Sequence, residues 1–329
     1  MRFRTHRRRA ATAGCRRRLA ARPCPPQAIR CEDEAVNRRD SLLAVLVAVL
    51  WGCNFVAIHA GLQDVPPFLF LAIRFTLVAF PLVLVIPRPQ ASWQAVVAVG
   101  GFMSLGQFAF LYLAMDIGMP AGLAALVLQA QVIFTIVIAR FALGEHASRR
   151  QWIGAGIGTL GLVIVAWGFG LDAPIVPLLV TVAAALSWGI GNVVARAAKI
   201  SSGLSLVVWS ALVVPIPCLA LSFLVEGPGE ISAALGSFGW QAWASTLYTV
   251  VLASLVGYTI FNGLMARHPA ASVVPYILLV PPVGVLASWI ALGEVPAPLE
   301  WVGGLVMMAG VAIATVTRRR TPVPIAPSP

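Results

Sequence analysis

A single arginine interrupts a long apolar stretch of the chain. Arg74 lies near the middle of segment 66–86, whose other residues are uncharged. A charge at the centre of a bilayer costs roughly 2.5–3.5 kcal/mol on insertion scales, so the guanidinium must face protein or water. Its planar fork of donors matches a carboxylate, and one interpretation is that Arg74 binds the acidic group of a small molecule. The other is a structural arginine that donates to backbone carbonyls or to a neighbouring polar side chain.

Two tryptophan–glycine pairs are each followed by an asparagine. Trp51 and Asn54 are three residues apart, and Trp188 and Asn192 are four apart, so each pair shares one helical face. The glycine beside each tryptophan permits close approach of helices or local unwinding, and unwinding frees backbone groups for a polar ligand. We expect helix breaks near these glycines to hold the charged ends of a substrate. The alternative is that the asparagines make hydrogen bonds between helices.

Several other polar side chains lie in apolar segments. Gln107 and Gln129 are amides, which both donate and accept and therefore suit an amino-acid substrate. Gln129 shares a helical face with small residues, whereas we expect Gln131 to pack against another helix. The remaining candidates for gates or walls of a substrate path are Tyr258, Asn262 and Tyr276.

The titratable groups do not form an enzyme site. The sequence has no Gly-x-Ser-x-Gly motif, no His-Glu-x-x-His motif and no pair of deeply placed acids, so we predict that the protein is not an enzyme. The five cysteines lack metal-ligand spacing, and we predict neither a metal nor a cofactor. His59 and Asp116 near segment ends are candidates for proton coupling. Gly144 and Gly293 each precede a glutamate and are expected to cap helix ends.

The composition indicates a membrane protein. Hydrophobic residues make up 59% of the chain and charged residues 11%, against about 25% charged in soluble domains. Each apolar segment has about the length that crosses a bilayer as a helix. We predict an all-α integral membrane protein with ten transmembrane helices near 41–60, 66–86, 93–113, 119–140, 150–168, 174–195, 204–225, 240–265, 270–292 and 299–317.

The cations predict the orientation. All 23 Lys and Arg residues except Arg74 fall in the tails or in loops on one side. Positive loops stay in the cytoplasm, so both termini are expected to be cytoplasmic. The net charge of +11 does not indicate a nucleic-acid partner, because the cations occupy the leader and the segment ends.

The chain contains an internal repeat. A shift of 149 residues places Pro120 on Pro269 and Trp152 on Trp301, and a shift of 137 places Trp51 on Trp188. Five segments per copy is an odd number, so the copies must insert in opposite orientations. Two inverted repeats are typical of secondary transporters, whose substrate site lies between the repeats.

These features divide the chain into four parts. We expect a basic disordered leader at 1–35, a first repeat at 36–168, a second repeat at 174–317 and a cytoplasmic tail at 318–329. Val36 is a candidate native start, because a GTG codon inside an over-extended gene would be written as valine.

The sequence resembles the EamA type of the drug/metabolite transporter superfamily. The resemblance rests on residues 51–56, Trp-Gly-Cys-Asn-Phe-Val, on Arg74 with Phe75, and on the repeated Gly-Glu. The run 118–131 is similar to the O-acetylserine/cysteine exporter branch. The resemblance implies ten helices with cytoplasmic termini, a cavity between the repeats, and efflux of amino acids without ATP.

We therefore predict a secondary transporter in the bacterial inner membrane. It would export amino acids and related metabolites, including cysteine and O-acetylserine, by alternating access with proton coupling. Its predicted partners are a small amino-acid-like substrate and the lipid bilayer, and the sequence indicates no oligomeric state. The open alternatives are a multidrug, nucleobase or other neutral-metabolite transporter, uptake in place of efflux, an intramembrane enzyme, and a non-transporting sensor.

Overall fold

The computed structural model describes residues 37–80, 82–145, 147–168, 175–198, 203–268, 273 and 276–315. Within these ranges the chain forms helices joined by turns and loops, and it contains no strand. This confirms the predicted all-helical class. The predicted leader 1–35, the candidate start Val36 and the predicted tail 318–329 lie outside the described residues.

The helices of the first half come in chain order. They are α1 (Arg38–Leu62), α2 (Pro67–Ala79), the short η1 (Leu82–Leu84), α3 (Trp93–Val99), the π-helix η2 (Gly100–Gly106), α4 (Gln107–Asp116), α5 (Ala121–Val127), α6 (Ala130–Ala142) and α7 (Arg149–Gly168).

The helices of the second half are also given in chain order. They are α8 (Ile175–Ala197), α9 (Gly203–Ala211), α10 (Pro215–Leu221), the π-helix η3 (Ser222–Glu226), α11 (Gly227–Gly236), α12 (Trp240–Leu247), the π-helix η4 (Tyr248–Val256), α13 (Gly257–Arg267), α15 (Val280–Leu292) and α16 (Pro298–Thr315).

Nine helical runs among the described residues are long and apolar enough to cross a membrane. They correspond to every predicted segment except 270–292. That segment lies partly outside the described residues, and its described part includes the shorter apolar helix α15.

Local sequence explains where several helices begin and end. Asn37 caps α1 by accepting from the backbone N–H of Asp40 at 2.8 Å, and such caps satisfy donors that the first turn leaves free. Gly144 and Gly293 have φ of 65° and 71°, the left-handed conformation that glycine adopts most readily at a helix end. The predicted glycine caps are thereby confirmed. Pro215 begins α10 after a turn that separates it from α9.

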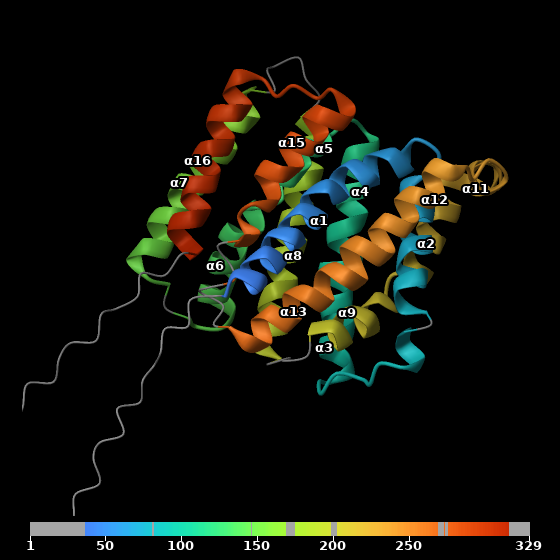
Figure 1. Cartoon of the computed structure of the whole chain (residues 1–329), viewed down its shortest axis with the longest axis horizontal. Helices are drawn as coiled ribbons and strands as arrows, with labels where there is room; N and C mark the ends of the chain where they lie inside the picture. The colour runs from blue at the N-terminus through green and yellow to red at the C-terminus, as the bar shows by residue number, and fades with distance from the viewer. Residues whose placement is uncertain are drawn as a thin grey trace, which may run out of the picture. The chain divides into compact units, whose positions relative to one another are not determined.

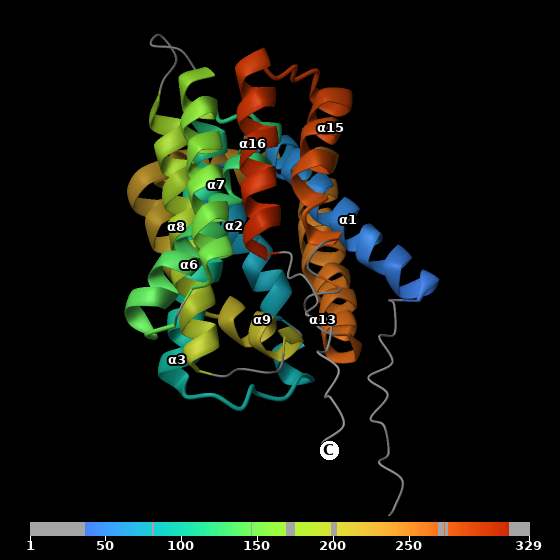
Figure 2. The same ribbon diagram turned by 90° about the vertical axis from the view of Figure 1, so that its left-hand side faces the viewer.

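Helices α7 and α16 pack side by side through glycines (Figures 1 and 2). A Cβ added to Gly161 would lie 2.3 Å from the backbone N of Met307, and one added to Gly310 would lie 2.3 Å from the backbone N of Gly158. Small residues allow backbones to approach this closely. Later residues of α7 face earlier residues of α16, so these two helices, which the 149-residue shift superimposes, run antiparallel.

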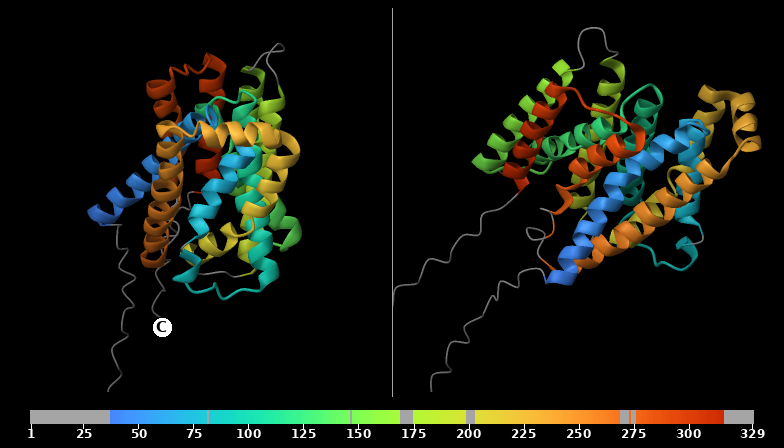
Figure 3. Two further views of the ribbon diagram at one scale, coloured as in Figure 1. Left: turned by 90° about the vertical axis from the view of Figure 1, so that its right-hand side faces the viewer. Right: turned by 45° about the horizontal axis from the view of Figure 1, so that its top comes forward.

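Helices at equivalent positions in the two halves also have equivalent neighbours. Helix α8 packs against α4 and α6, and α1 packs correspondingly against α13 and α15. Figure 3 shows α1 running beside the continuous helical run of α12, η4 and α13. The π-helices η2 and η4 also occupy matching places before α4 and α13. Two three-helix groups of similar construction therefore face one another.

Candidate substrate site

A cavity of about 390 Å³ lies between these two groups of helices. Residues from both halves of the chain line it, and they comprise aromatic, aliphatic and amide side chains with one cation. They are Trp51, Asn54, Phe55, Arg74, Met103, Gln107, Phe108, Leu111, Ala125, Leu128, Gln129, Gln131, Trp188, Asn192, Ala253, Tyr258, Phe261, Ile277 and Val280.

All but two of the residues predicted to bind substrate line this cavity. The exceptions are Asn262 and Tyr276. Asn262 has a buried Nδ2 without a hydrogen-bond partner. The Tyr276 hydroxyl donates to the Ser41 Oγ at 2.9 Å and so links the start of α1 to the chain before α15. The structure therefore brings together residues that lie up to about 200 positions apart in the sequence.

Arg74 is buried in the wall of the cavity, with 2% of its surface exposed. Its Nη1 donates to the Tyr112 hydroxyl at 2.9 Å, and its Nη2 donates to the Ser254 Oγ at 3.2 Å. Its Nε is buried and has no hydrogen-bond partner. The guanidinium carbon lies 4.4 Å from the centre of the Phe108 ring, a cation–π distance. Arg74 is therefore held by neutral groups that leave its Nε without a hydrogen-bond partner.

No acid among the described residues neutralises the charge of Arg74. Among the described residues, no carboxylate oxygen lies within 4.0 Å of its guanidinium nitrogens. A buried cation without a counter-ion is costly. Its position on the cavity therefore favours a site that an anionic group completes.

The tryptophan–glycine pairs do not break their helices, and that prediction was wrong. Helix α1 is continuous through Gly52, and α8 is continuous through Gly189. A Cβ at Gly52 would lie 2.6 Å from Val283 Cγ1, and one at Gly189 would lie 2.8 Å from Phe134 Cβ. These glycines allow close helix packing, which was the other reading of the pattern.

The breaks occur in other helices. Helix α5 ends at Val127 and α6 begins at Ala130, with Leu128 and Gln129 in a turn between them. A matching turn precedes α15. Gln129 lies at the first break, 8% exposed, and Leu128 beside it also lines the cavity. The breaks therefore lie on the cavity, although no glycine or proline marks the first one.

The asparagines behave differently from one another. The Asn192 Nδ2 donates to Gln131 Oε1 at 2.8 Å and to Thr135 Oγ1 at 3.3 Å. The Oδ1 of Asn54 is buried and has no hydrogen-bond partner. Asn192 therefore joins α8 to α6, and Asn54 keeps an acceptor available. Gln131 therefore packs against another helix, as expected, and it also lines the cavity.

Sequence reasoning missed the partners of Arg74. Tyr112 is fully buried, and Ser254 lies in the π-helix η4. Their sequence spacing from Arg74 carries no signal, because Tyr112 is 38 residues away and Ser254 is 180 residues away. Trp51 is also anchored by a distant group, since its Nε1 donates to the carbonyl of Ala253 at 2.9 Å.

Two carboxylates cap helices beside the cavity walls. Glu294 accepts from the backbone N–H groups of Ala121 and Gly122 at 3.0 and 3.1 Å. Glu226 similarly accepts from the N–H groups of Phe68 and Leu69. A negative charge is favourable at a helix N-terminus, so these acids stabilise α5 and α2.

The buried acid of the described residues is Asp40, at 2% exposure. Its Oδ2 lies 2.6 Å from His268 Nε2, and its Oδ1 lies 3.0 Å from Arg267 Nη1. This cluster joins the start of α1 to the end of α13, away from His59 and Asp116. No group of three or more His, Cys, Asp or Glu suited to a metal occurs in the described part of the chain.

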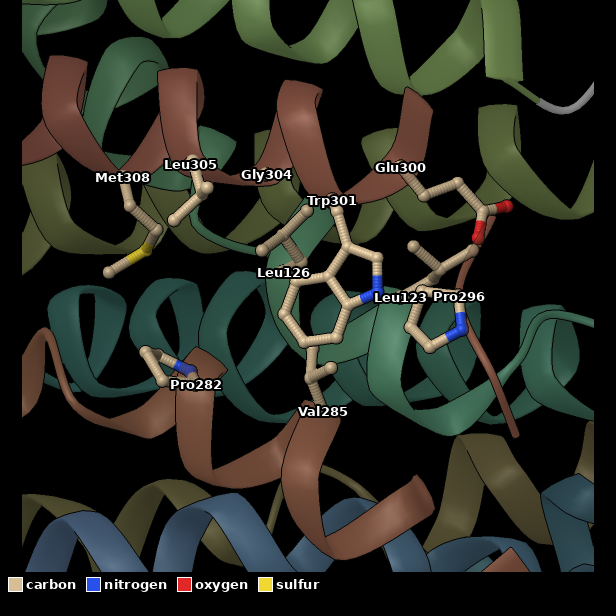
Figure 4. A pocket seen from close by; sticks show the side chains of 10 residues that line it. All are labelled: Leu123, Leu126, Pro282, Val285, Pro296, Glu300, Trp301, Gly304, Leu305 and Met308. Carbon is tan, nitrogen blue, oxygen red and sulfur yellow. The ribbon is translucent and has the colours of Figure 1, made fainter. Parts of the chain in front are cut away.

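A second, smaller cavity of about 90 Å³ lies between α5, α15 and α16. Figure 4 shows the Trp301 ring at the centre of the residues that line it, which are apolar except for Glu300. Glu300 Oε2 accepts from the backbone N–H of Ala297 at 2.7 Å. The lining of this cavity contains no cation comparable to Arg74.

Sequence comparisons identify the family. The model of the EamA-like transporter family matches residues 39–167 and again residues 175–316. The chain belongs to the EamA-like transporter family. The central cavity is thus the cavity of a membrane transporter, and both matched regions contribute side chains to it.

Named relatives of this EamA-like transporter include exporters. It is 38% identical to a protein of Salmonella typhimurium named "Probable amino-acid metabolite efflux pump", over 84% of this chain and 95% of that protein. An Escherichia coli protein of the same name is 36% identical, over 84% of this chain and 95% of that protein. A "Probable terminal-alkyne amino-acid exporter" of Streptantibioticus cattleyicolor is 28% identical, over 84% and 94%. A protein of known crystal structure is similar over 87% of this chain and 99% of that protein's chain, with a TM-score of 0.58 and 20% sequence identity. This similarity shows the fold.

Proposed function

We propose that this protein exports amino acids and related small metabolites across the bacterial inner membrane. The names of the bacterial relatives support a metabolite exporter. Nine apolar helical runs in the described part of the chain support a multi-pass membrane protein. Transport by alternating access requires a central site that each side reaches in turn, and the cavity between the two helix groups has that position.

The proposal rests on the burial and the incomplete hydrogen bonding of Arg74. It is buried on the cavity, it has no acidic neighbour among the described residues, and its Nε is unused. A substrate carboxylate supplies the missing negative charge and accepts from the fork of donors. The same group is found on every α-amino acid.

The neighbouring amides suit the other end of an amino acid. The free Oδ1 of Asn54 is an acceptor for an ammonium group. Gln107 and Gln129 are buried on the same cavity and can adapt as donor or acceptor. Cysteine and O-acetylserine fit this pattern, because both carry the ammonium and carboxylate groups with an uncharged side chain.

The transporter would have ten membrane helices in two inverted repeats, with both termini in the cytoplasm. The antiparallel packing of α7 and α16 supports inversion. The distribution of cations supports the orientation. We further propose that proton entry drives export, with His59 and Asp116 near the segment ends as the candidate groups.

Efflux from proteoliposomes tests the proposal. Vesicles loaded with labelled cysteine or O-acetylserine are compared for wild type, Arg74→Ala and Arg74→Lys, with and without a proton gradient. We expect gradient-dependent efflux by wild type and a loss of at least about tenfold in Arg74→Ala, because charge-assisted hydrogen bonds each contribute roughly 1.5–3 kcal/mol. Arg74→Lys should insert normally yet export slowly, since a point charge replaces the fork.

Arg196→Gln is the matched control, because Arg196 is an exposed cation paired with Glu145 outside the cavity. It should export at the wild-type rate. Normal export by a well-inserted Arg74→Ala protein would show that the carboxylate role is wrong. Absence of amino-acid efflux from folded wild type, with export of nucleobases or drugs, would point to neutral substrates.

A further inference from the structure

The cavity has two walls of related construction. The first wall consists of the lining residues of η2, α4, α6 and α8 together with Leu128 before α6. The second wall consists of those of α1, η4, α13 and α15 together with Ile277 before α15. Each wall is centred on the helix that carries a tryptophan of the Trp-Gly pairs. The positions on the two walls can therefore be compared in pairs.

The spacing of the lining residues is the same on both walls. Phe108 and Leu111 on the first wall recur 150 positions later as Tyr258 and Phe261 on the second. The pair Leu128 and Gln131 recurs 149 positions later as Ile277 and Val280. The pair Trp51 and Phe55 recurs 137 positions later as Trp188 and Asn192. Equivalent backbone positions thus present side chains to the same space.

The side chains at these equivalent positions have diverged in polarity. Gln131 on the first wall corresponds to Val280 on the second, and Asn192 corresponds to Phe55. Gln107 corresponds to Gly257, where an added Cβ would lie 2.6 Å from the Trp51 Nε1. In these three comparisons the amide is on the first wall, whereas Asn54 and the Tyr258 hydroxyl are polar groups of the second wall opposite Gly191 and Phe108.

Aromatic side chains pack against one another on the second wall. The Trp51 ring centre lies 5.0 Å from that of Tyr258 and 5.3 Å from that of Phe261. Its indole N–H is already used by the carbonyl of Ala253. Ile277 and Val280 complete this surface. Apart from the Tyr258 hydroxyl and the free Oδ1 of Asn54, which the proposed function assigns to the substrate's ammonium group, the second wall has no polar side chain. A charged side chain would therefore lack a partner there, which is unfavourable.

We propose that the transporter selects amino acids with uncharged, apolar side chains, and that Val280, Ile277 and Phe261 determine this preference. The inference rests on the proposed function, because it assigns the substrate's charged groups to Arg74 and the amides. The substrate lies across the cavity with its side chain on the second wall. Amino acids with charged side chains bind poorly, because the second wall gives the additional charge no partner.

Methionine and glutamine provide a sharp comparison, because their side chains have similar length and differ in polarity. Purified protein in proteoliposomes is assayed for counterflow of labelled leucine, with unlabelled methionine, glutamine, lysine or glutamate as competitors. Wild type should be inhibited by methionine at concentrations at least about tenfold lower than by glutamine, and lysine and glutamate should be weaker still. A tenfold difference corresponds to about 1.4 kcal/mol.

Val280→Gln places on the second wall the residue found at the equivalent first-wall position. It should reduce the methionine preference to about twofold or reverse it. Val280→Leu is the matched control, because leucine has nearly the size of glutamine and stays apolar, and it should keep methionine ahead of glutamine. Ile277→Asn tests the same surface at a second position and should shift the preference in the same direction.

The results distinguish a wrong side-chain assignment from a wrong proposed function. If lysine, glutamate and glutamine compete as well as methionine, or if Val280→Gln and Val280→Leu have the same preference, the side-chain assignment is wrong and amino-acid transport stands. If folded wild type shows no counterflow of leucine and none of cysteine or O-acetylserine, both the side-chain assignment and the proposed function are overturned.

Discussion

Arg74 and Tyr112 meet inside the protein, where Nη1 of the arginine donates to the tyrosine hydroxyl at 2.9 Å. Helix α2 carries the arginine and α4 carries the tyrosine. The hydroxyl is neutral, so it orients the guanidinium without cancelling its charge. The contact therefore holds a cation in place at the wall of the cavity and leaves it available to an anion.

Loss of that hydroxyl should weaken substrate binding as well as stability. Tyr112→Phe leaves a buried arginine donor unsatisfied, which costs roughly 1–3 kcal/mol. We expect a lower melting temperature in detergent and a several-fold weaker apparent affinity for amino acids, measured by competition for labelled leucine. The guanidinium loses one of its two hydrogen-bonded anchors and becomes less well oriented.

Tyr248→Phe is the control for Tyr112→Phe. The Tyr248 hydroxyl donates to the carbonyl of Leu50 at 3.0 Å, away from Arg74. This variant should lose stability and keep the wild-type affinity. Equal losses of affinity in the two variants would contradict an orienting role for Tyr112.

The cap on α5 should contribute measurably to stability. Glu294→Gln removes the negative charge that accepts from two backbone N–H groups at 3.0 and 3.1 Å. Caps and charges at helix N-termini contribute about 1 kcal/mol, so we expect a lower melting temperature. Glu145 is the repeat counterpart of Glu294 and pairs with Arg196 while both side chains are about half exposed. Such pairs contribute roughly 0–1 kcal/mol, and Glu145→Gln should destabilise less than Glu294→Gln does.

The α7–α16 contact should not tolerate a methyl group. In Gly161→Ala the new Cβ would lie 2.3 Å from a backbone nitrogen of α16, so the helices must separate. Overpacking of this kind costs roughly 1–3 kcal/mol. The expected result is a lower unfolding temperature for the purified protein.

The same helix supplies a control for Gly161→Ala. A Cβ added to Gly156 would meet nothing within 4 Å, and alanine is the better helix former by about 1 kcal/mol. Gly156→Ala should therefore match or exceed the wild-type unfolding temperature. If both variants behave alike, the close glycine packing is not a source of stability.

The sequence predicted the helical class and most of the polar residues that line the cavity, because both depend on patterns along one chain. A charge in an apolar segment must be buried against protein, and this indicated Arg74. Amides in apolar segments must likewise face a partner or a cavity, which indicated Gln107 and Gln129. These arguments do not depend on knowing which helices are neighbours.

The remaining features of the site depend on neighbours. Gln131 packs against α8 as predicted, and its spacing along the chain did not indicate that it also lines the cavity. The expected breaks at Gly52 and Gly189 were wrong, because a glycine that permits unwinding also permits close packing, and tertiary contact decides between them. Tyr112 and Ser254 were missed because a hydroxyl in an apolar helix gives no sign of its distant partner.

Recognition of a carboxylate by Arg74 is the central claim, and equilibrium binding to the purified transporter tests it directly. Labelled leucine or cysteine is competed with each amino acid and with the amine that remains when its carboxylate is removed. The account predicts that wild type binds the amino acid at least about tenfold more tightly than its amine, and that folded Arg74→Ala binds both equally weakly. Equal binding of the two ligands to wild type, or retained discrimination in Arg74→Ala, would contradict it.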